Sequence, residues 1–265
     1  MKITVIGGGN MGITYAQSIH ANFSNSIISI VEKDAEKIEH LKKTTPFKVF
    51  NNAEDCIVDA EIIFLAIKPQ VCQDVFKTIK DLVNPEQIII SIMAGVTLDS
   101  MSNGIGVPKI VRAMPNLPAQ VGKGVTGYLN SSKISNSEAA IIKDLLSSTG
   151  TVIKLTNEQD IDAITALSGS GPAYVFYFMN AMIEQAQTFG FDENEAKSII
   201  LNTFKGTIDL FENSNDSANT WIDRVTSKGG TTHQALTTFT NLNTEDNIKQ
   251  GVKAAFERAK ELGKS

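Results

Sequence analysis

Short apolar runs alternate with amphipathic stretches from residue 1 to about residue 155. A run that is apolar at nearly every position is typical of a strand buried on both faces, whereas apolar residues three and four positions apart indicate a helix. The pattern therefore predicts a doubly wound α/β domain, in which helices connect the strands of a parallel sheet. The predicted strands are residues 3–6, 27–31, 61–67, 87–93, 109–113, 125–129 and 152–153, and the predicted helices are residues 13–21, 34–43, 71–83 and 135–148.

The pattern changes near Asn157, where the strand-like runs stop and only helical stretches follow. The change is a shift in composition and not a flexible linker, and no internal repeat or low-complexity tract is visible. We therefore predict two domains, residues 1–157 and an all-α domain of residues 158–265. The predicted helices of the second domain are residues 160–189, 192–213, 231–241 and 244–263.

One of these helices is apolar on every face. It contains Ala173-Tyr-Val-Phe-Tyr-Phe-Met179, and such a helix has to be buried on all sides. A helical domain of about 110 residues has little core in which to bury it. Two arrangements meet this requirement: a second subunit that covers the helix, or a monomeric bundle with this helix at its centre. The small size of the domain favours the dimer.

Glycines at the end of the first strand have a spacing that suits a dinucleotide. Gly7, Gly9 and Gly12 form G-x-G-x-x-G between the first strand and the first helix. In this context the first glycine allows a tight turn, the second allows close approach of a pyrophosphate, and the third allows the helix to pack against the strand. The helix that begins near Asn10 directs free N–H groups at the same point. An ordinary glycine turn is the alternative interpretation.

The second strand ends at Glu32-Lys33-Asp34. An acidic residue about 20 positions after the glycines would accept hydrogen bonds from the adenosine ribose and repel a 2′-phosphate, which favours NAD over NADP. Lys33 acts in the opposite direction, since a cation there can hold that phosphate. Alternatively, Glu32 and Asp34 are solvated residues at the strand end, with Asp34 as the N-cap of the next helix.

Two further strands end at the edge of the sheet where a cofactor would lie. Lys68 and Pro69 follow one of them directly, and Pro69 suits the first turn of a helix. Lys68 either contacts the ribose or phosphate, or is a surface lysine. Ala94 and Gly95 follow the next strand, and their small size would let a nicotinamide ring come close.

Two loops in the second half are rich in glycine and hydroxyl residues. They are Ser168-Gly-Ser-Gly-Pro172 and Val225-Thr-Ser-Lys-Gly-Gly-Thr-Thr232. Consecutive glycines followed by hydroxyl residues at a helix start present several N–H groups to one point, which suits a carboxylate. Ordinary helix capping would need the same residue types. His233 follows the second loop and is either a proton donor or a residue that caps, packs or faces solvent.

The composition restricts the class of protein. The chain has 265 residues, 42% of them hydrophobic and 20% charged, and a formal net charge of -5 without a basic cluster. These values are typical of a globular protein with no nucleic-acid partner. The two cysteines have no metal or redox spacing, and we see no secretory signal or membrane span, so we expect a cytoplasmic protein without a metal site.

Four stretches together resemble pyrroline-5-carboxylate reductases. They are Gly7 to Gly12, Arg112-Ala-Met-Pro-Asn116, Ser168-Gly-Ser-Gly-Pro-Ala-Tyr174 and Val225-Thr-Ser-Lys-Gly-Gly-Thr-Thr-His-Gln-Ala-Leu236. The resemblance implies an N-terminal Rossmann-type domain and a C-terminal α-helical dimerisation domain, in a homodimer that can assemble into a decamer. It also implies a reaction, the last step of proline biosynthesis. NADPH or NADH gives a hydride to the C=N carbon of 1-pyrroline-5-carboxylate, and L-proline is formed.

The resemblance also implies roles for individual residues. The loop of residues 227–232 would bind the substrate carboxylate through N–H groups and hydroxyls, and Thr232 would act in catalysis by a hydrogen bond to the ring nitrogen, across a seam between two chains. The implied substrate-binding residues are Ser227, Gly229, Gly230, Thr231 and Thr232. The implied cofactor-binding residues are Gly7, Gly9, Asn10, Met11, Gly12, Glu32, Lys33, Asn52, Ala66, Lys68, Pro69, Ala94 and Gly95.

The chain departs from the family pattern at the cofactor. Many members have Asn-Arg-Ser/Thr, which holds the 2′-phosphate, where this chain has Glu32-Lys33-Asp34. We therefore predict that NADH is used at least as well as NADPH. Leu117 replaces a common Thr and Lys228 a common Pro, and neither change affects the assignment.

Two other classes of protein share parts of this pattern. A β-hydroxyacid dehydrogenase has the same domain plan but carries a catalytic lysine on its long interdomain helix, and residues 173–187 contain no lysine. A nucleotide-sensing protein without turnover would use the glycine motif alone, and both loops would then be helix caps.

Overall fold

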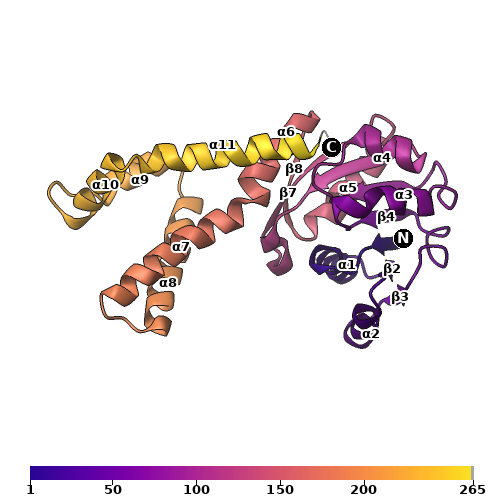
Figure 1. Cartoon of the computed structure of the whole chain (residues 1–265), viewed down its shortest axis with the longest axis horizontal. Coiled ribbons are helices and arrows are strands. Elements are labelled where there is room, and N and C mark those ends of the chain that lie inside the picture. The colour runs from indigo at the N-terminus through magenta and orange to yellow at the C-terminus, as the bar shows by residue number, and fades with distance from the viewer. Residues whose placement is uncertain (264–265) are drawn as a thin grey trace. The chain divides into compact units, whose positions relative to one another are not determined.

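The computed structural model describes residues 1–263, and its first part is built on one sheet (Figure 1). The strands of this sheet lie in the order β3-β2-β1-β4-β5-β6-β7-β8. All neighbouring strands are parallel except β6 and β7, which are antiparallel. The strands are β1 (Lys2–Ile6), β2 (Ile27–Val31), β3 (Lys48–Phe50), β4 (Ile62–Leu65), β5 (Ile88–Ser91), β6 (Ile110–Met114), β7 (Gly124–Asn130) and β8 (Gly150–Lys154).

The central strands are buried on both faces. In β4, Ile62 and Phe64 enter one apolar cluster, while Ile63 and Leu65 enter a second cluster on the opposite face. Side chains of α1, α2 and α5 belong to the first cluster, and those of α3 and α4 belong to the second. These helices are α1 (Asn10–Asn22), α2 (Ala35–Thr44), α3 (Cys72–Ile79), α4 (Leu98–Ile105) and α5 (Asn136–Ser147). The doubly wound fold class predicted from the sequence is confirmed.

The remaining elements are helical. They are α6 (Glu158–Ile164), the π-helical turn η3 (Thr165–Gly169), α7 (Gly171–Thr188), α8 (Glu193–Glu212), α9 (Ala218–Arg224), α10 (Thr231–Asn241) and α11 (Thr244–Leu262). The chain forms two compact units. The first unit contains Met1–Gly171 and the segment that starts at Ala255, and the second unit is Pro172–Ala254. The predicted boundary at residue 157 stays a prediction.

The stretch predicted to be helical over residues 160–189 consists of separate helical elements, and the predicted loop 168–172 lies at their junction. The stretch is interrupted at η3, where the N–H of Ser170 donates to the carbonyl of Thr165, five residues back, at 2.9 Å. Pro172 lacks an N–H group, and the small residues before it allow the local change of helix type. β3, α4 and α9 were not predicted, since each is short and carries a weak pattern.

The second unit has almost no core of its own. Its buried hydrophobic residues are Ala186, Ala196 and Ile200. Large apolar side chains of the same unit are exposed instead, with Phe176 at 60% and Tyr177 at 76%. In a monomeric bundle, the other helices would cover a central helix. The exposed side chains of α7 therefore do not fit a monomeric bundle. None of the helices within residues 1–263 combines the length and the apolar character needed to cross a bilayer.

A charged contact outside both apolar clusters connects β6, α5 and the segment before β5. Lys109 Nζ donates to Glu86 Oε2 at 2.7 Å and to Glu138 Oε1 at 2.8 Å. Glu138 also forms the capping box of α5, because its Oε2 accepts from the N–H of Ser135 at 2.8 Å. The ammonium of Lys109 and the Ser135 donors hold the pKa of Glu138 down at about 2.

We expect Glu138→Gln to destabilise the protein at neutral pH by about 1 kcal/mol, or about 2–4 °C in Tm. The folded-state pKa lies below the ordinary value, so the contribution of the charge is present above about pH 4.5 and is lost as the pH falls toward about 2. Thermal unfolding at one protein concentration should therefore show a difference that shrinks below pH 4.5. Glu86→Gln is the control, because Glu86 is 85% exposed and should change little.

Candidate functional site

The carboxyl ends of the parallel strands form one edge, and the strand order reverses on this edge between β1 and β4. Open α/β sheets bind ligands at such a reversal. The chain turns tightly there, since the N–H of Gly7 donates to the carbonyl of Val31 at 2.8 Å and the N–H of Ala66 donates to the carbonyl of Ile6 at 2.8 Å. Gly7 and Ala66, two of the implied cofactor residues, are therefore neighbours.

The glycine turn has the geometry that a dinucleotide needs. Gly7 has φ +110, and a Cβ at this position would lie 2.3 Å from the carbonyl oxygen of Ala66. A Cβ on Gly12 would lie 2.1 Å from the carbonyl oxygen of Gly7, so the first turn of α1 packs directly on the loop. A Cβ on Gly9 would meet no atom within 4 Å. Gly9 is the N-cap of α1 and makes no side-chain cap, so the N–H groups at the helix start face an open space. These residues fit a pyrophosphate.

The carboxylate of Glu32 lies against this turn. Its Oε2 accepts from the N–H of Gly8 at 3.1 Å, and its Oε1 accepts from the N–H groups of Lys33 and Asp34 at 2.8 and 3.1 Å. Asp34 is the N-cap of α2, where its Oδ1 accepts from the N–H of Lys37 at 3.0 Å. The two carboxylates therefore have different roles: Asp34 caps a helix, and Glu32 places a negative charge beside the glycine turn.

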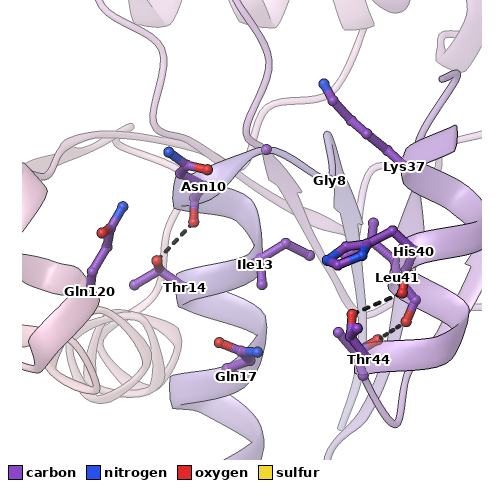
Figure 2. Close-up of a pocket in the computed structure, with 12 residues that line it drawn as sticks. Gly8, Asn10, Ile13, Thr14, Gln17, Lys37, His40, Leu41, Thr44 and Gln120 are labelled. Carbon is purple, nitrogen blue, oxygen red and sulfur yellow. Dashed lines mark hydrogen bonds between the residues drawn. The ribbon is translucent and has the colours of Figure 1, made fainter.

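A groove of about 650 Å³ starts at the glycine turn and runs between α1 and α2 (Figure 2). Gly8 and Asn10 lie at one end, and Gln120 reaches the groove from a third element. One face of α2 forms a wall, with Lys37, His40, Leu41 and Thr44 at helical spacing. That spacing was visible in the sequence, yet these groove residues were not predicted.

A second cavity, of about 710 Å³, lies beside the opposite face of the sheet and contains Pro69, Ala94 and Gly95. Leu262 also lines it, and a Cβ on Gly95 would lie 2.8 Å from the carbonyl oxygen of Leu262. Burial raises the pKa of the Cys72 thiol in the wall of this cavity, so the sulfur stays protonated near neutral pH. Pro69 begins a short 3-10 turn before α3, as its position after β4 predicted.

The loop between α9 and α10 belongs to the second unit and forms a compact hairpin. The N–H of Gly230 donates to the carbonyl of Ser227 at 3.0 Å, and Gly229 adopts φ +75 to close the turn. Gly230 is the N-cap of α10 and provides no side chain, so the first N–H groups of α10 have no side-chain cap. Thr231 and Thr232 begin that helix. The hairpin therefore presents donors and hydroxyls at a helix N-terminus, which suits a carboxylate.

The side chains of several other predicted residues do not line either cavity. Lys33, Lys68 and Asn52 are exposed and line neither cavity. Met11 packs partly against the apolar cluster under α1. His233 is exposed, and we find no hydrogen bond of its ring within residues 1–263. No group of three metal-ligating side chains was found in that described part of the chain.

Two motifs of the sequence contact each other. Asn116, which follows β6, accepts from the N–H of Val125 at 2.8 Å and donates through Nδ2 to Ser168 Oγ at 3.0 Å. Arg112 on β6 is 2% exposed, and its guanidinium donates to Glu158 at 3.0 Å and Asp162 at 3.4 Å. The stretch 112–116 is thus bound to α6 and η3. Glu158 and Asp162 were not predicted, although their spacing of four residues on a helix was visible.

Comparisons with known proteins agree with this architecture. The family model for NADP oxidoreductase, coenzyme F420-dependent, matches residues 2–95, and the model for pyrroline-5-carboxylate reductase dimerisation matches residues 158–262. With the glycine turn at the sheet edge, these matches define a dinucleotide-dependent oxidoreductase with a helical dimerisation domain.

Full-length relatives identify the family. The chain is 32% identical to pyrroline-5-carboxylate reductase of Pseudomonas aeruginosa, over 98% of this chain and 96% of the relative. It is 31% identical to the Synechocystis enzyme, over 100% and 99%. The crystal structure of Plasmodium falciparum pyrroline carboxylate reductase with NADP bound has a TM-score of 0.89 at 27% identity, covering 99% of this chain and 98% of that one. The chain belongs to the pyrroline-5-carboxylate reductase family.

Proposed function

We propose that this protein reduces the C=N bond of 1-pyrroline-5-carboxylate to L-proline with a hydride from NADH or NADPH. Family membership over the full chain carries this proposal. The geometry supports it in two places: a glycine turn that fits a pyrophosphate, and a hairpin whose donors fit a small carboxylate. The proposal assigns the cofactor to the first unit and the substrate carboxylate to the second.

The cofactor-binding residues are proposed along the carboxyl edge of the sheet. Gly7, Gly9 and Gly12 with the start of α1 would hold the pyrophosphate. Glu32 would accept hydrogen bonds from the adenosine ribose. The small residues after β5 would lie toward the nicotinamide. The further proposed contacts are Asn10, Met11, Lys33, Asn52, Ala66, Lys68, Pro69, Ala94 and Gly95.

The substrate-binding residues are proposed in the hairpin before α10. Ser227, Gly229, Gly230 and Thr231 would bind the carboxylate through N–H groups and hydroxyls. Thr232 would donate to or accept from the ring nitrogen and so orient the C=N bond. The cofactor supplies the hydride, and an iminium carbon is already electrophilic. A positioned hydroxyl is therefore sufficient to orient the C=N bond, and the reaction requires no strong acid or metal. Orientation can supply about 7–11 kcal/mol of the barrier.

We propose a homodimer in which the second unit is covered by a partner, with a decamer as a further assembly. The family match to a dimerisation domain and the exposed apolar side chains of the second unit support the dimer. A cytoplasmic location and the absence of nucleic-acid and membrane partners are proposed from the net charge of -5 and the two unpaired cysteines.

The activity is tested by mixing the protein, NADH or NADPH and 1-pyrroline-5-carboxylate, and following the loss of absorbance of the reduced nicotinamide. Proline should form in equal amount. A nucleotide-sensing protein would bind the dinucleotide without this loss, and a β-hydroxyacid dehydrogenase would turn over a hydroxy acid instead. Either result would remove the proposal.

We expect Thr232→Ala to lower kcat/KM for pyrroline-5-carboxylate by about 5-fold to 150-fold, because one oriented hydrogen bond of about 1–3 kcal/mol is lost. Thr232→Ser keeps the hydroxyl and should retain most of the activity. Thr237→Ala is the control on the same helix and should leave kcat/KM unchanged. The Thr237 hydroxyl is used within α10, where it donates to the carbonyl of His233 at 2.9 Å. Unchanged turnover and unchanged KM in Thr232→Ala would refute the role.

We expect kcat/KM with NADH to equal or exceed that with NADPH, because a 2′-phosphate adds a charge of about −1.5 to −2 next to Glu32. Glu32→Ser should shift the ratio about tenfold toward NADPH. Glu36→Ser removes the same charge from an exposed position in the first turn of α2 and should leave the ratio unchanged. A large NADPH advantage in the unaltered protein would contradict this prediction.

We expect Tyr177→Asp to weaken the dimer at least about 100-fold, because a carboxylate would be buried without a partner in an apolar interface. Sedimentation velocity over a range of concentrations measures the change. Ser132→Asp adds the same charge to an exposed turn of the first unit and serves as the control. A monomer at micromolar concentration in the unaltered protein would speak against the dimer itself.

A further inference from the structure

The loop that follows β5 is fixed at both of its ends by contacts that involve one arginine. Ser91, the last residue of β5, pairs in the sheet with Arg112 of β6. Leu98, the first residue of α4, donates its N–H to Glu158 Oε1 at 2.9 Å. The same oxygen accepts from Arg112 Nη1 at 3.0 Å. The loop with Ala94 and Gly95 lies between these two points.

Glu158 and Asp162 bind the same guanidinium but differ in what else they contact. Asp162 Oδ1 accepts from Arg112 Nη2 at 3.4 Å, while Glu158 also holds the main chain at the start of α4. A carboxylate at a helix N-terminus satisfies a free N–H and interacts favourably with the helix dipole. Arg112 is 2% exposed and Glu158 35% exposed, so the guanidinium is buried while solvent reaches one side of the carboxylate.

We propose that Glu158, held in place by Arg112, is a positioning residue for the loop that carries Ala94 and Gly95. It acts through the N–H of Leu98, and fixing that N–H sets the distance at which the loop approaches the nicotinamide end of the cofactor. This inference rests on the proposed function, which assigns the loop to the cofactor.

The loop leaves little room for a shift, which is why its anchor matters. A Cβ on Gly95 would lie 2.8 Å from the carbonyl oxygen of Leu262, so the loop already touches the end of α11 on that side. Val96 is 7% exposed and belongs to the apolar cluster beneath α3 and α4. Loss of the hydrogen bond of the Leu98 N–H would therefore change the position of Ala94 and Gly95 within this packing.

The test compares Glu158→Ala with Asp162→Ala. Each variant removes one carboxylate from Arg112, but only the first releases Leu98. We expect Glu158→Ala to raise the Kd for NADH, measured by nicotinamide fluorescence, and the KM for NADH by about tenfold. Asp162→Ala should stay within about twofold of the unaltered protein in both values. Glu158→Gln keeps an acceptor oxygen and should restore most of the affinity.

Leu98→Pro is a second variant that does not depend on the ion pair. Proline suits the first position of a helix but has no N–H, so it removes the donor and leaves Glu158 and Arg112 intact. It also removes the Leu98 side chain from the apolar cluster, and Leu98→Ala, which keeps the N–H, is the control for that loss. It should reproduce the rise in Kd and KM for NADH. Equal effects of Glu158→Ala and Asp162→Ala, or no effect of Leu98→Pro, would overturn the inference. Failure of the unaltered protein to oxidise either NADH or NADPH in the presence of 1-pyrroline-5-carboxylate would instead overturn the proposed function, and the Kd for NADH, which is measured without turnover, would still test the inference.

Discussion

The close approach of β1 to β4 is the constraint on which the candidate site depends. The main chain turns after Ile6 in a space that has no room for a Cβ on Gly7, and the carbonyl of Ala66 closes that space. This turn brings the start of α1 to the edge of the sheet and leaves its N–H groups open. Glu32 reaches the same turn because β2 lies next to β1. A wider turn would separate the N–H groups at the start of α1 from the carboxylate of Glu32.

A different constraint governs the second unit, which cannot bury its own apolar surface. The buried hydrophobic side chains of residues 172–254 are Ala186, Ala196 and Ile200, while aromatic side chains of α7 are exposed. A free energy of folding of normal size requires more apolar burial than this. The hairpin before α10 lies in this unit, so association that covers the apolar surface would also stabilise the unit that carries the hairpin.

The sequence predicted those parts of the fold whose signal is local. Continuous apolar runs predicted the central strands, because burial on both faces leaves no polar position in them. β3 was missed because an edge strand of three residues has no such run. The glycine turn was predicted from its spacing, and the role of Asp34 as a cap from its position before a helix.

The contact of Glu32 with Gly8 and the contact of Asn116 with Ser168 join residues far apart in the chain. The spacing of the motif placed Glu32 near the glycine turn but did not predict its hydrogen bond to Gly8, and no pattern in the residues indicated the contact of Asn116 with Ser168.

The stretch Arg112–Asn116 contacts two separate segments of the chain. β6 is the last strand of the parallel series, and its polar side chains bind the segment that begins at Glu158. Arg112 reaches the start of α4 through Glu158, and thus the loop after β5. Asn116 holds Ser168, three residues before α7 begins at Gly171. The stretch 112–116 therefore contacts both Glu158, which accepts from the N–H of Leu98, and Ser168 in the turn before α7. Substitutions in this stretch would affect both contacts at once, whereas the carboxylate of Glu32 accepts from the N–H groups of Gly8, Lys33 and Asp34. A substitution at Glu32 would therefore leave the contacts of Arg112 and Asn116 in place.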